Sequence, residues 1–170
     1  MVVTETSAVR HARAATKLEG VYMWSVRASL LVLLLTLATP AFAGAKEDAL
    51  AVLEKWSQAF AASDVDTIVE TYAADALFMG TGSKTVVTDR AEIRKYFEAT
   101  LLVNRPRGAP ITSSQTMVLS DEVVLITGLN ASTGVRDGVP FSNPGRVTFV
   151  IAKRGGEWKI VHFHRSAMPK

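Results

Sequence analysis

The pattern that most restricts the fold lies near the C-terminus, where two β-type runs flank Gly155-Gly156. The first run covers residues 146–154 and the second covers residues 157–165, and both are rich in β-branched and aromatic side chains. Two such runs joined by a Gly-Gly pair predict a β-hairpin with a two-residue turn. We therefore expect the chain to end in an antiparallel hairpin.

One-to-one counting along this hairpin brings two arginines together. If the turn pairs Arg154 with Glu157, Arg146 lies directly opposite Arg165. Opposite residues on a ladder have Cβ atoms roughly 4.5 to 5.5 Å apart, so like charges there repel. A negative group is therefore expected near both, either an internal carboxylate or a bound anion. The candidate internal carboxylates are Glu70, Asp75 and Glu98.

Strand alternation divides the hairpin into two faces, because successive side chains point to opposite sides of a sheet. One face is expected to hold Arg146, Thr148, Val150, Val161, Phe163 and Arg165. The opposite face is expected to hold Val147, Phe149, Ile151, Ile160, His162 and His164. The second set is too apolar to meet water, so we predict that it forms an oligomer interface with a second copy of the chain.

The two histidines of the second face allow another interpretation, a metal site. His162 and His164 point the same way on a strand, and imidazole is a common metal ligand. Their expected cross-strand neighbours are Phe149 and Val147, so this face offers no third ligand. We therefore predict no metal and favour histidines packed in a sheet or an interface.

Residues 23–43 have the features of a secretory signal peptide. A basic start at 23–27 precedes an apolar run at 28–38, and Ala41-Phe42-Ala43 supplies a cleavage site. The apolar run is shorter than the roughly 20 residues that a membrane span needs. We expect residues 1–22 to be an over-extended, disordered start and residues 44–170 to be one domain. That domain is expected to be periplasmic or secreted, without attachment to the membrane.

Charge and cysteine content exclude two classes of function. The chain has 19 Lys and Arg against 16 Asp and Glu, and four of these bases and two of these acids precede residue 44. Residues 44–170 therefore carry a net charge of +1, which gives nucleic acid no basic surface to bind. The chain has no cysteine, which excludes disulfides and thiol chemistry.

Apolar periodicity upstream of the hairpin predicts helices first and strands afterwards. The first segment shows it well, since Ala49, Leu53, Trp56 and Phe60 recur at helical spacing. The order is typical of an α+β fold, in which three N-terminal helices pack on one face of a curved antiparallel sheet and enclose a pocket. The predicted helices cover 46–62, 65–72 and 90–101. The predicted strands cover 76–79, 111–119 and 123–135, ahead of the hairpin.

The run Gly156-Glu157-Trp158-Lys159-Ile160-Val161-His162-Phe163-His164-Arg165-Ser166-Ala167-Met168-Pro169 closely resembles the closing strand of the calcium/calmodulin-dependent protein kinase II association (hub) domain. That domain belongs to the nuclear transport factor 2-like superfamily, and a weaker likeness extends over residues 46–169. The resemblance implies a cone-shaped fold with an internal pocket, carboxylate-binding arginines at Arg146 and Arg165, and oligomer contacts on the outer sheet surface. The chain has no kinase domain, and a further cavity arginine of that family is replaced around Asn130-Ala131.

Two classes of function follow. The first is an exported, oligomeric binding or assembly module that holds a small anionic molecule without a cofactor. Its expected ligand-binding residues are Arg146, Arg165, Thr148, Tyr72, Trp56 and Phe163. The alternative is an enzyme resembling ketosteroid isomerases or SnoaL-like cyclases and dehydratases, which need an acid or base of shifted pKa in an apolar pocket. The candidates for that catalytic role are Tyr72 and Asp75.

Overall fold

Three helices form where the sequence repeats apolar residues at helical spacing. The computed structural model describes residues 44–170, so the predicted start (1–22) and signal peptide (23–43) lie outside the described residues. The helices are α2 (Ala45–Ala62), α3 (Val65–Glu70) and α4 (Arg90–Leu101). Helix α3 ends at Glu70 rather than at Tyr72, because Tyr72 already begins the first strand.

Aspartates cap free backbone N–H groups at the starts of α3 and α4. The Asp64 side chain accepts a hydrogen bond from Thr67 N–H at 3.0 Å, at the start of α3. Asp89 accepts from Ala91 N–H in the same way at the start of α4. A side-chain oxygen at this position satisfies a donor that has no partner inside the helix.

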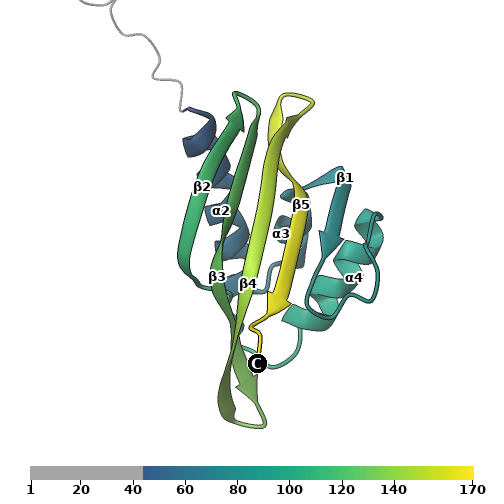
Figure 1. Ribbon diagram of the computed structural model, residues 1–170. Coiled ribbons are helices and arrows are strands. Elements are labelled where there is room, and N and C mark those ends of the chain that lie inside the picture. The colour runs from purple at the N-terminus through teal and green to yellow at the C-terminus, as the bar shows by residue number, and fades with distance from the viewer. Residues whose placement is uncertain (1–43) are drawn as a thin grey trace, which may run out of the picture. The chain divides into compact units, whose positions relative to one another are not determined.

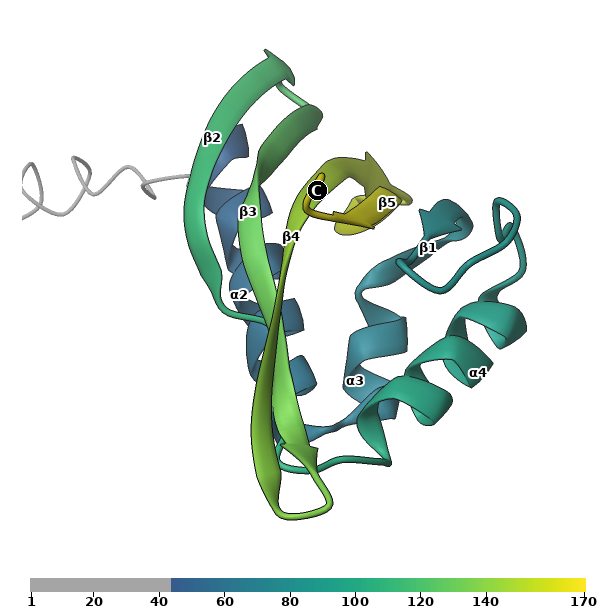
Figure 2. The ribbon, with the colours of Figure 1, turned by 60° about the horizontal axis from the view of Figure 1, so that its bottom comes forward.

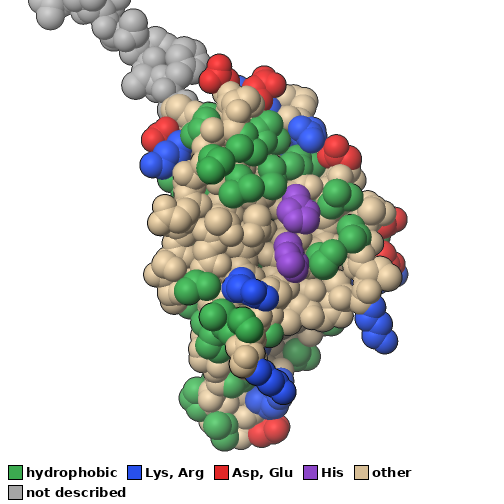
Figure 3. Space-filling view, viewed as in Figure 1, with side chains coloured by type: hydrophobic (Ala, Val, Ile, Leu, Met, Phe, Trp, Pro, Cys, Tyr) green, Lys and Arg blue, Asp and Glu red, His purple; other side chains and the backbone are tan. Residues whose placement is uncertain are grey.

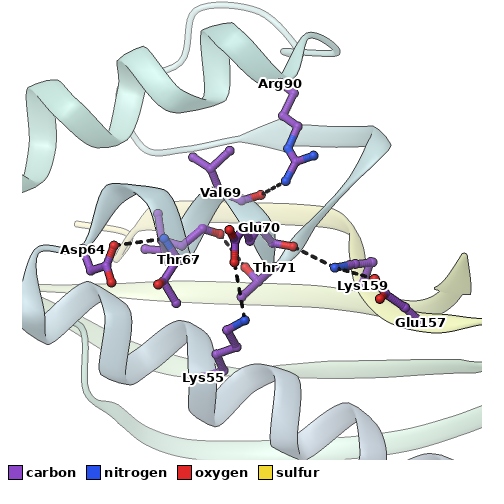
Figure 4. Close-up of polar contacts among 10 residues, drawn as sticks. Lys55, Asp64, Thr67, Val69, Glu70, Thr71, Arg90, Glu157 and Lys159 are labelled. Atoms are coloured by element: carbon purple, nitrogen blue, oxygen red, sulfur yellow. Dashed lines mark hydrogen bonds and ion pairs between the residues drawn. The ribbon is translucent and has the colours of Figure 1, made fainter.

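Helix α3 is short, and cations from two other elements hold its C-terminal end (Figure 4). The backbone oxygen of Val69 accepts from Arg90, at the start of α4, at 3.1 Å. The backbone oxygen of Glu70 accepts from Lys159 of the sheet, also at 3.1 Å. Positive side chains at the C-terminal end of a helix satisfy its free carbonyls and oppose its dipole. These bonds tie α3 to both α4 and the sheet.

Five strands form one curved sheet that wraps around the helices (Figures 1 and 2). They are β1 (Tyr72–Met79), β2 (Ile111–Ser120), β3 (Val123–Arg136), β4 (Val139–Arg154) and β5 (Glu157–Ala167). The order across the sheet is β1-β5-β4-β3-β2. The last four strands of the chain pair antiparallel, whereas β1 pairs parallel to β5. The predicted α+β architecture is confirmed, with this one parallel pair added.

The closing hairpin is confirmed, but its register departs from the one-to-one count. Ile151 lies opposite Ile160, as predicted. The next pair is Val150 with His162, so Val161 is an extra residue in β5 and forms a β-bulge. A bulge shifts the alternation of every side chain beyond it.

The core supplies the physical reason for this bulge. Ile160 and Phe163 are both buried, at 0% and 3% exposed, yet they are three residues apart on one strand. Strict alternation would turn one of them outward, and the extra residue lets both point inward. The predicted pairing of Arg146 with Arg165 is therefore wrong. Arg146 lies opposite Ser166, and Arg165 lies opposite Val147.

Aromatic rings fill the space between the helices and the inner face of the sheet. Phe163 stands among four of them, with centroid distances of 5.1 Å to Phe78, 5.1 Å to Phe149, 5.8 Å to Trp56 and 6.4 Å to Tyr72. The contact with Phe78 is stacked and the others are edge-to-face or tilted, and aromatic contacts of this kind add to the free energy gained by burial. Four residues predicted to form an oligomer interface belong to this core instead: Val147, Phe149, Ile151 and Ile160.

Neighbouring residues on β5 provide a test of the bulged register. We expect Phe163→Ala to lower the free energy of unfolding by about 3–5 kcal/mol, because it empties a core site lined by aromatic rings. His164→Ala, one residue along on the outer face, should change it by no more than about 0.5 kcal/mol. Urea unfolding of both variants measures the difference, and a larger loss in the histidine variant would contradict this register.

Candidate functional site

Arg165 of β5 is the charged residue around which the candidate site is built. Its Nε donates to Asn130 Oδ1 at 3.0 Å, its Nη1 to Thr81 Oγ1 at 2.6 Å, and its Nη2 to the backbone oxygen of Asn143 at 2.7 Å. All three acceptors are neutral oxygens. A guanidinium has five N–H donors, so one remains on each terminal nitrogen.

Glycine at position 145 leaves the space in which this guanidinium lies. A Cβ at Gly145 would come within 2.6 Å of Arg165 Nη2 and 2.7 Å of the backbone oxygen of Ser166. Both distances are shorter than real Cβ contacts, so a larger residue would have to push the arginine or the strand aside. Strand β4 therefore helps to position Arg165 by lacking a side chain at this point.

A cavity of about 500 Å³ opens beside Arg165, between α2, α4 and the inner face of the sheet. Its volume falls within the range of small-molecule sites. Its walls are mostly apolar, with a few hydroxyl and amide groups. The lining residues are Trp56, Phe60, Thr81, Tyr96, Phe97, Thr100, Ala109, Asn130, Ser132, Asn143, Pro144, Phe163, Arg165, Ala167 and Met168.

The lining described here contains no carboxylate, so Arg165 carries an uncompensated charge. The three acids considered as internal partners lie elsewhere: Glu70 pairs with Lys55, Asp75 with Arg154, and Glu98 with Arg94. Burial lowers the pKa of Arg165 from its ordinary value, and Tyr96 offsets part of that effect. Arginine remains protonated at such a site, so the cavity keeps a positive charge.

The two predicted catalytic candidates are separated by the fold. Tyr72 is buried, and its hydroxyl accepts a hydrogen bond from Trp56 Nε1 at 3.1 Å. Burial raises the pKa of Tyr72 well above its ordinary value, although the bond from Trp56 opposes the shift. Asp75 lies on the surface in an ion pair with Arg154 at 3.3 Å. Neither side chain lines the cavity.

The residues predicted to bind ligand divide between the two faces of the sheet. Trp56, Phe163 and Arg165 line the cavity. Arg146 and Thr148 do not, because they alternate along β4 with the buried Val147 and Phe149 and so lie on the outer face. Thr148 there lies 2.9 Å from the hydroxyl of Thr127, and Arg146 is exposed.

Sequence reasoning missed most of the polar lining. Asn130 gave a detectable sign, since it has the same strand parity as the buried Val124 and Ile126 and an amide among inward apolar positions needs a partner. Thr81 and Asn143 had no such sign in the sequence. They reach Arg165 from a loop and from another strand, over separations of 84 and 22 residues.

The outer face of the sheet carries exposed apolar side chains next to the histidines (Figure 3). Strand pairing aligns Met117, Leu125, Val150, His162 and Leu77 across all five strands. Met117 and Leu77 are 61% and 46% exposed. We call these five residues the outer apolar row. The next row contains His164, so both histidines lie on this face as predicted. The four apolar residues predicted to share the face with them lie in the core instead: Val147, Phe149, Ile151 and Ile160.

No group of three or more metal-ligating side chains lies close enough together to hold an ion within residues 44–170. The helices between residues 44 and 170 are each too short or too polar to span a bilayer.

A curved sheet that encloses three helices and an apolar cavity with a few polar groups defines the nuclear transport factor 2-like class of fold. Within that class, the chain belongs to the SnoaL-like domain family, whose model matches residues 49–170. Comparison with curated proteins gave no match.

Solved structures agree with this assignment. A protein from Xanthomonas campestris, assigned to the calcium/calmodulin-dependent protein kinase II association domains, is 28% identical with a TM-score of 0.67, covering 78% of this chain and 94% of that one. An NTF2-like protein of unknown function from Pseudomonas putida is 19% identical with a TM-score of 0.64, covering 74% and 88%. An NTF2-like protein with a cystatin-like fold from Novosphingobium aromaticivorans is 12% identical with a TM-score of 0.62, covering 83% and 87%. The last two show the fold alone.

The environment of His162 predicts a loss of stability in mild acid. Burial lowers the pKa of His162 below its ordinary value of 6.5, and the nearby His164 lowers it further, while a hydrogen bond to the Leu77 backbone opposes the shift. The unfolded chain therefore binds a proton before the folded one, and stability falls as the pH drops through 6.5. We expect His162→Gln to reduce the fall in the thermal midpoint between pH 7 and pH 5. Parallel profiles for the two proteins would contradict this environment.

Proposed function

We propose that this protein is a binding module whose cavity holds a small molecule with a carboxylate group. The observation that carries the proposal is the half-buried Arg165 guanidinium, which has three neutral acceptors and no acid in the described lining. A desolvated charge is normally paired, and its two remaining N–H groups suit the two oxygens of a carboxylate. Trp56 and Phe163 would cover the apolar part of the ligand.

Binding is favoured over proton-transfer catalysis because of what the cavity offers. Isomerases and dehydratases of this general type need a group that takes up or releases a proton near neutral pH. The ionisable side chains in the described lining are Tyr96 and Arg165, and neither is a carboxylate or an imidazole. Tyr72 is held by Trp56 outside the lining, and its raised pKa makes it a weaker acid.

Exchange of Arg165 tests the proposal directly. We expect small aliphatic monocarboxylates to raise the thermal midpoint of the wild type, with a gain in unfolding free energy of about 2.7 kcal/mol at one hundred times Kd. Arg165→Gln should abolish this response, because it removes the charge and the paired donors. The matched control is Arg146→Gln, which removes an exposed arginine from the other face of the sheet.

The outcomes distinguish carboxylate binding at Arg165 from a nonspecific effect of the protein's net charge. A response lost in both variants would indicate a nonspecific effect of net charge. The absence of any response in the wild type, across a series of chain lengths, would exclude carboxylate binding.

We also propose that two copies associate through the outer apolar row. The row runs across all five strands, contains no charged residue, and includes Met117 at 61% exposed. Exposed apolar surface on a sheet face is typical of an interface. We further propose that this assembly forms after export, because residues 23–43 have the signal-peptide pattern.

A charge placed in the row tests the association. We expect the wild type, expressed from residue 44, to sediment as a dimer or larger ring at micromolar concentration. Met117→Glu should weaken the association by about tenfold or more, or about 1.4 kcal/mol, because it places a carboxylate in a desolvated face. Leu102→Glu is the control, since Leu102 is 50% exposed but follows α4, away from the sheet face. A monomeric wild type would exclude this interface.

A further inference from the structure

A second guanidinium, that of Arg107, lies behind the cavity wall and has too few partners. The residue is only 9% exposed, and its Nε is buried without a hydrogen-bond partner in the part of the chain that the structure describes. Its Nη2 donates to Ser132 Oγ at 3.1 Å. Its guanidinium also lies 5.1 Å from the ring centroid of Phe141. The ring face attracts the cation, but it accepts no hydrogen bond in the plane of the guanidinium.

No acid neutralises Arg107 within residues 44–170, where it forms no salt bridge. Another cation lies close by, because Arg136 lies over the same Phe141 ring at 5.4 Å. Burial lowers the pKa of Arg107, and the repulsion from Arg136 lowers it further. Buried charges are normally paired, so this unpaired cation points to a negative partner that the chain does not supply.

Ser132 connects Arg107 to the cavity that contains Arg165. Ser132, which accepts its hydrogen bond, lines the cavity. The Ser132 hydroxyl uses its oxygen as the acceptor, so its hydrogen is free to donate toward a ligand. The Arg107 guanidinium therefore lies one hydrogen bond away from the cavity that Arg165 lines.

The fold makes a specific space for Arg107. A Cβ at Gly134 would lie 2.6 Å from Arg107 Nη1 and 2.8 Å from the Phe141 ring. The arginine therefore lies against bare backbone of β3, where a larger residue would displace it. A long cationic side chain that is buried at such a place loses conformational freedom, and packing against Phe141 alone does not require a charge.

We propose that the ligand of this cavity is a dicarboxylate, with one carboxylate bound by Arg165 and the other by the Ser132 hydroxyl, whose oxygen accepts a hydrogen bond from Arg107. This inference rests on the proposed function, since it names the class of molecule that the same cavity holds. The second carboxylate accepts from the Ser132 hydroxyl and compensates the Arg107 charge. An apolar chain between the two carboxylates lies against the aromatic wall formed by Trp56 and Phe163.

Calorimetric titration of residues 44–170 with saturated dicarboxylates, from malonate to adipate, tests the inference. Each is compared with the monocarboxylate of the same carbon number. We expect at least one dicarboxylate to bind about tenfold or more tightly than its monocarboxylate, because it adds a charge-assisted contact. Arg107→Gln should remove that preference and leave monocarboxylate affinity within about twofold. The matched control is Arg136→Gln, which removes the exposed cation on Phe141 and should keep the preference.

The outcomes separate this inference from the proposed function. If the wild type binds monocarboxylates and dicarboxylates equally, the inference is overturned and the proposed function stands. If the wild type binds neither series, both are overturned. A preference that survives Arg107→Gln also overturns the inference. Should that variant fail to fold, Ser132→Ala replaces it, because it removes the cavity contact while retaining the arginine, and an unchanged preference again contradicts the proposal.

Discussion

The β-bulge at Val161 is the constraint on which the rest of the structure depends. It lets Ile160 and Phe163 enter the core from the same strand, although strict alternation would expose one of them. The same shift turns Arg165 toward the helices, whereas Arg146 faces outward. One inserted residue therefore decides both the aromatic packing of the core and which arginine faces the cavity.

Two arginines place positive charge inside a mostly apolar fold. Arg165 and Arg107 are drawn into the protein by hydrogen bonds to neutral oxygens, and no described carboxylate accompanies either of them. A desolvated cation costs free energy unless an anion or several acceptors compensate it. An arrangement that retains this cost is typical of a site whose missing partner is a ligand. The SnoaL-like family membership is consistent with a cavity that is used for binding.

Sequence reasoning worked best where the signal was local and repeated. Apolar spacing and an aspartate cap placed α4 correctly, and Gly155-Gly156 placed the final turn. Those features depend on neighbouring residues alone. The prediction failed along β5 because one-to-one counting pairs each residue with a single partner. No local feature of the strand sequence indicates the bulge. The predicted division of the faces failed for two reasons. The bulge separates Arg165 from Arg146, and the face that holds Val147, Phe149, Ile151 and Ile160 packs in the core and not against a second copy.

For the candidate site, the sequence determined which residue types are available to form it: arginines near the end of the chain, aromatic residues at helical and strand spacing, and an amide among apolar positions. Tertiary structure decided which of them meet. Thr81 and Asn143 reach Arg165 from distant segments, and Arg107 comes from a connecting segment without periodicity. The physical reason is that hydrogen bonds and desolvation act through space, whereas periodicity in a sequence records only which side of an element each residue occupies.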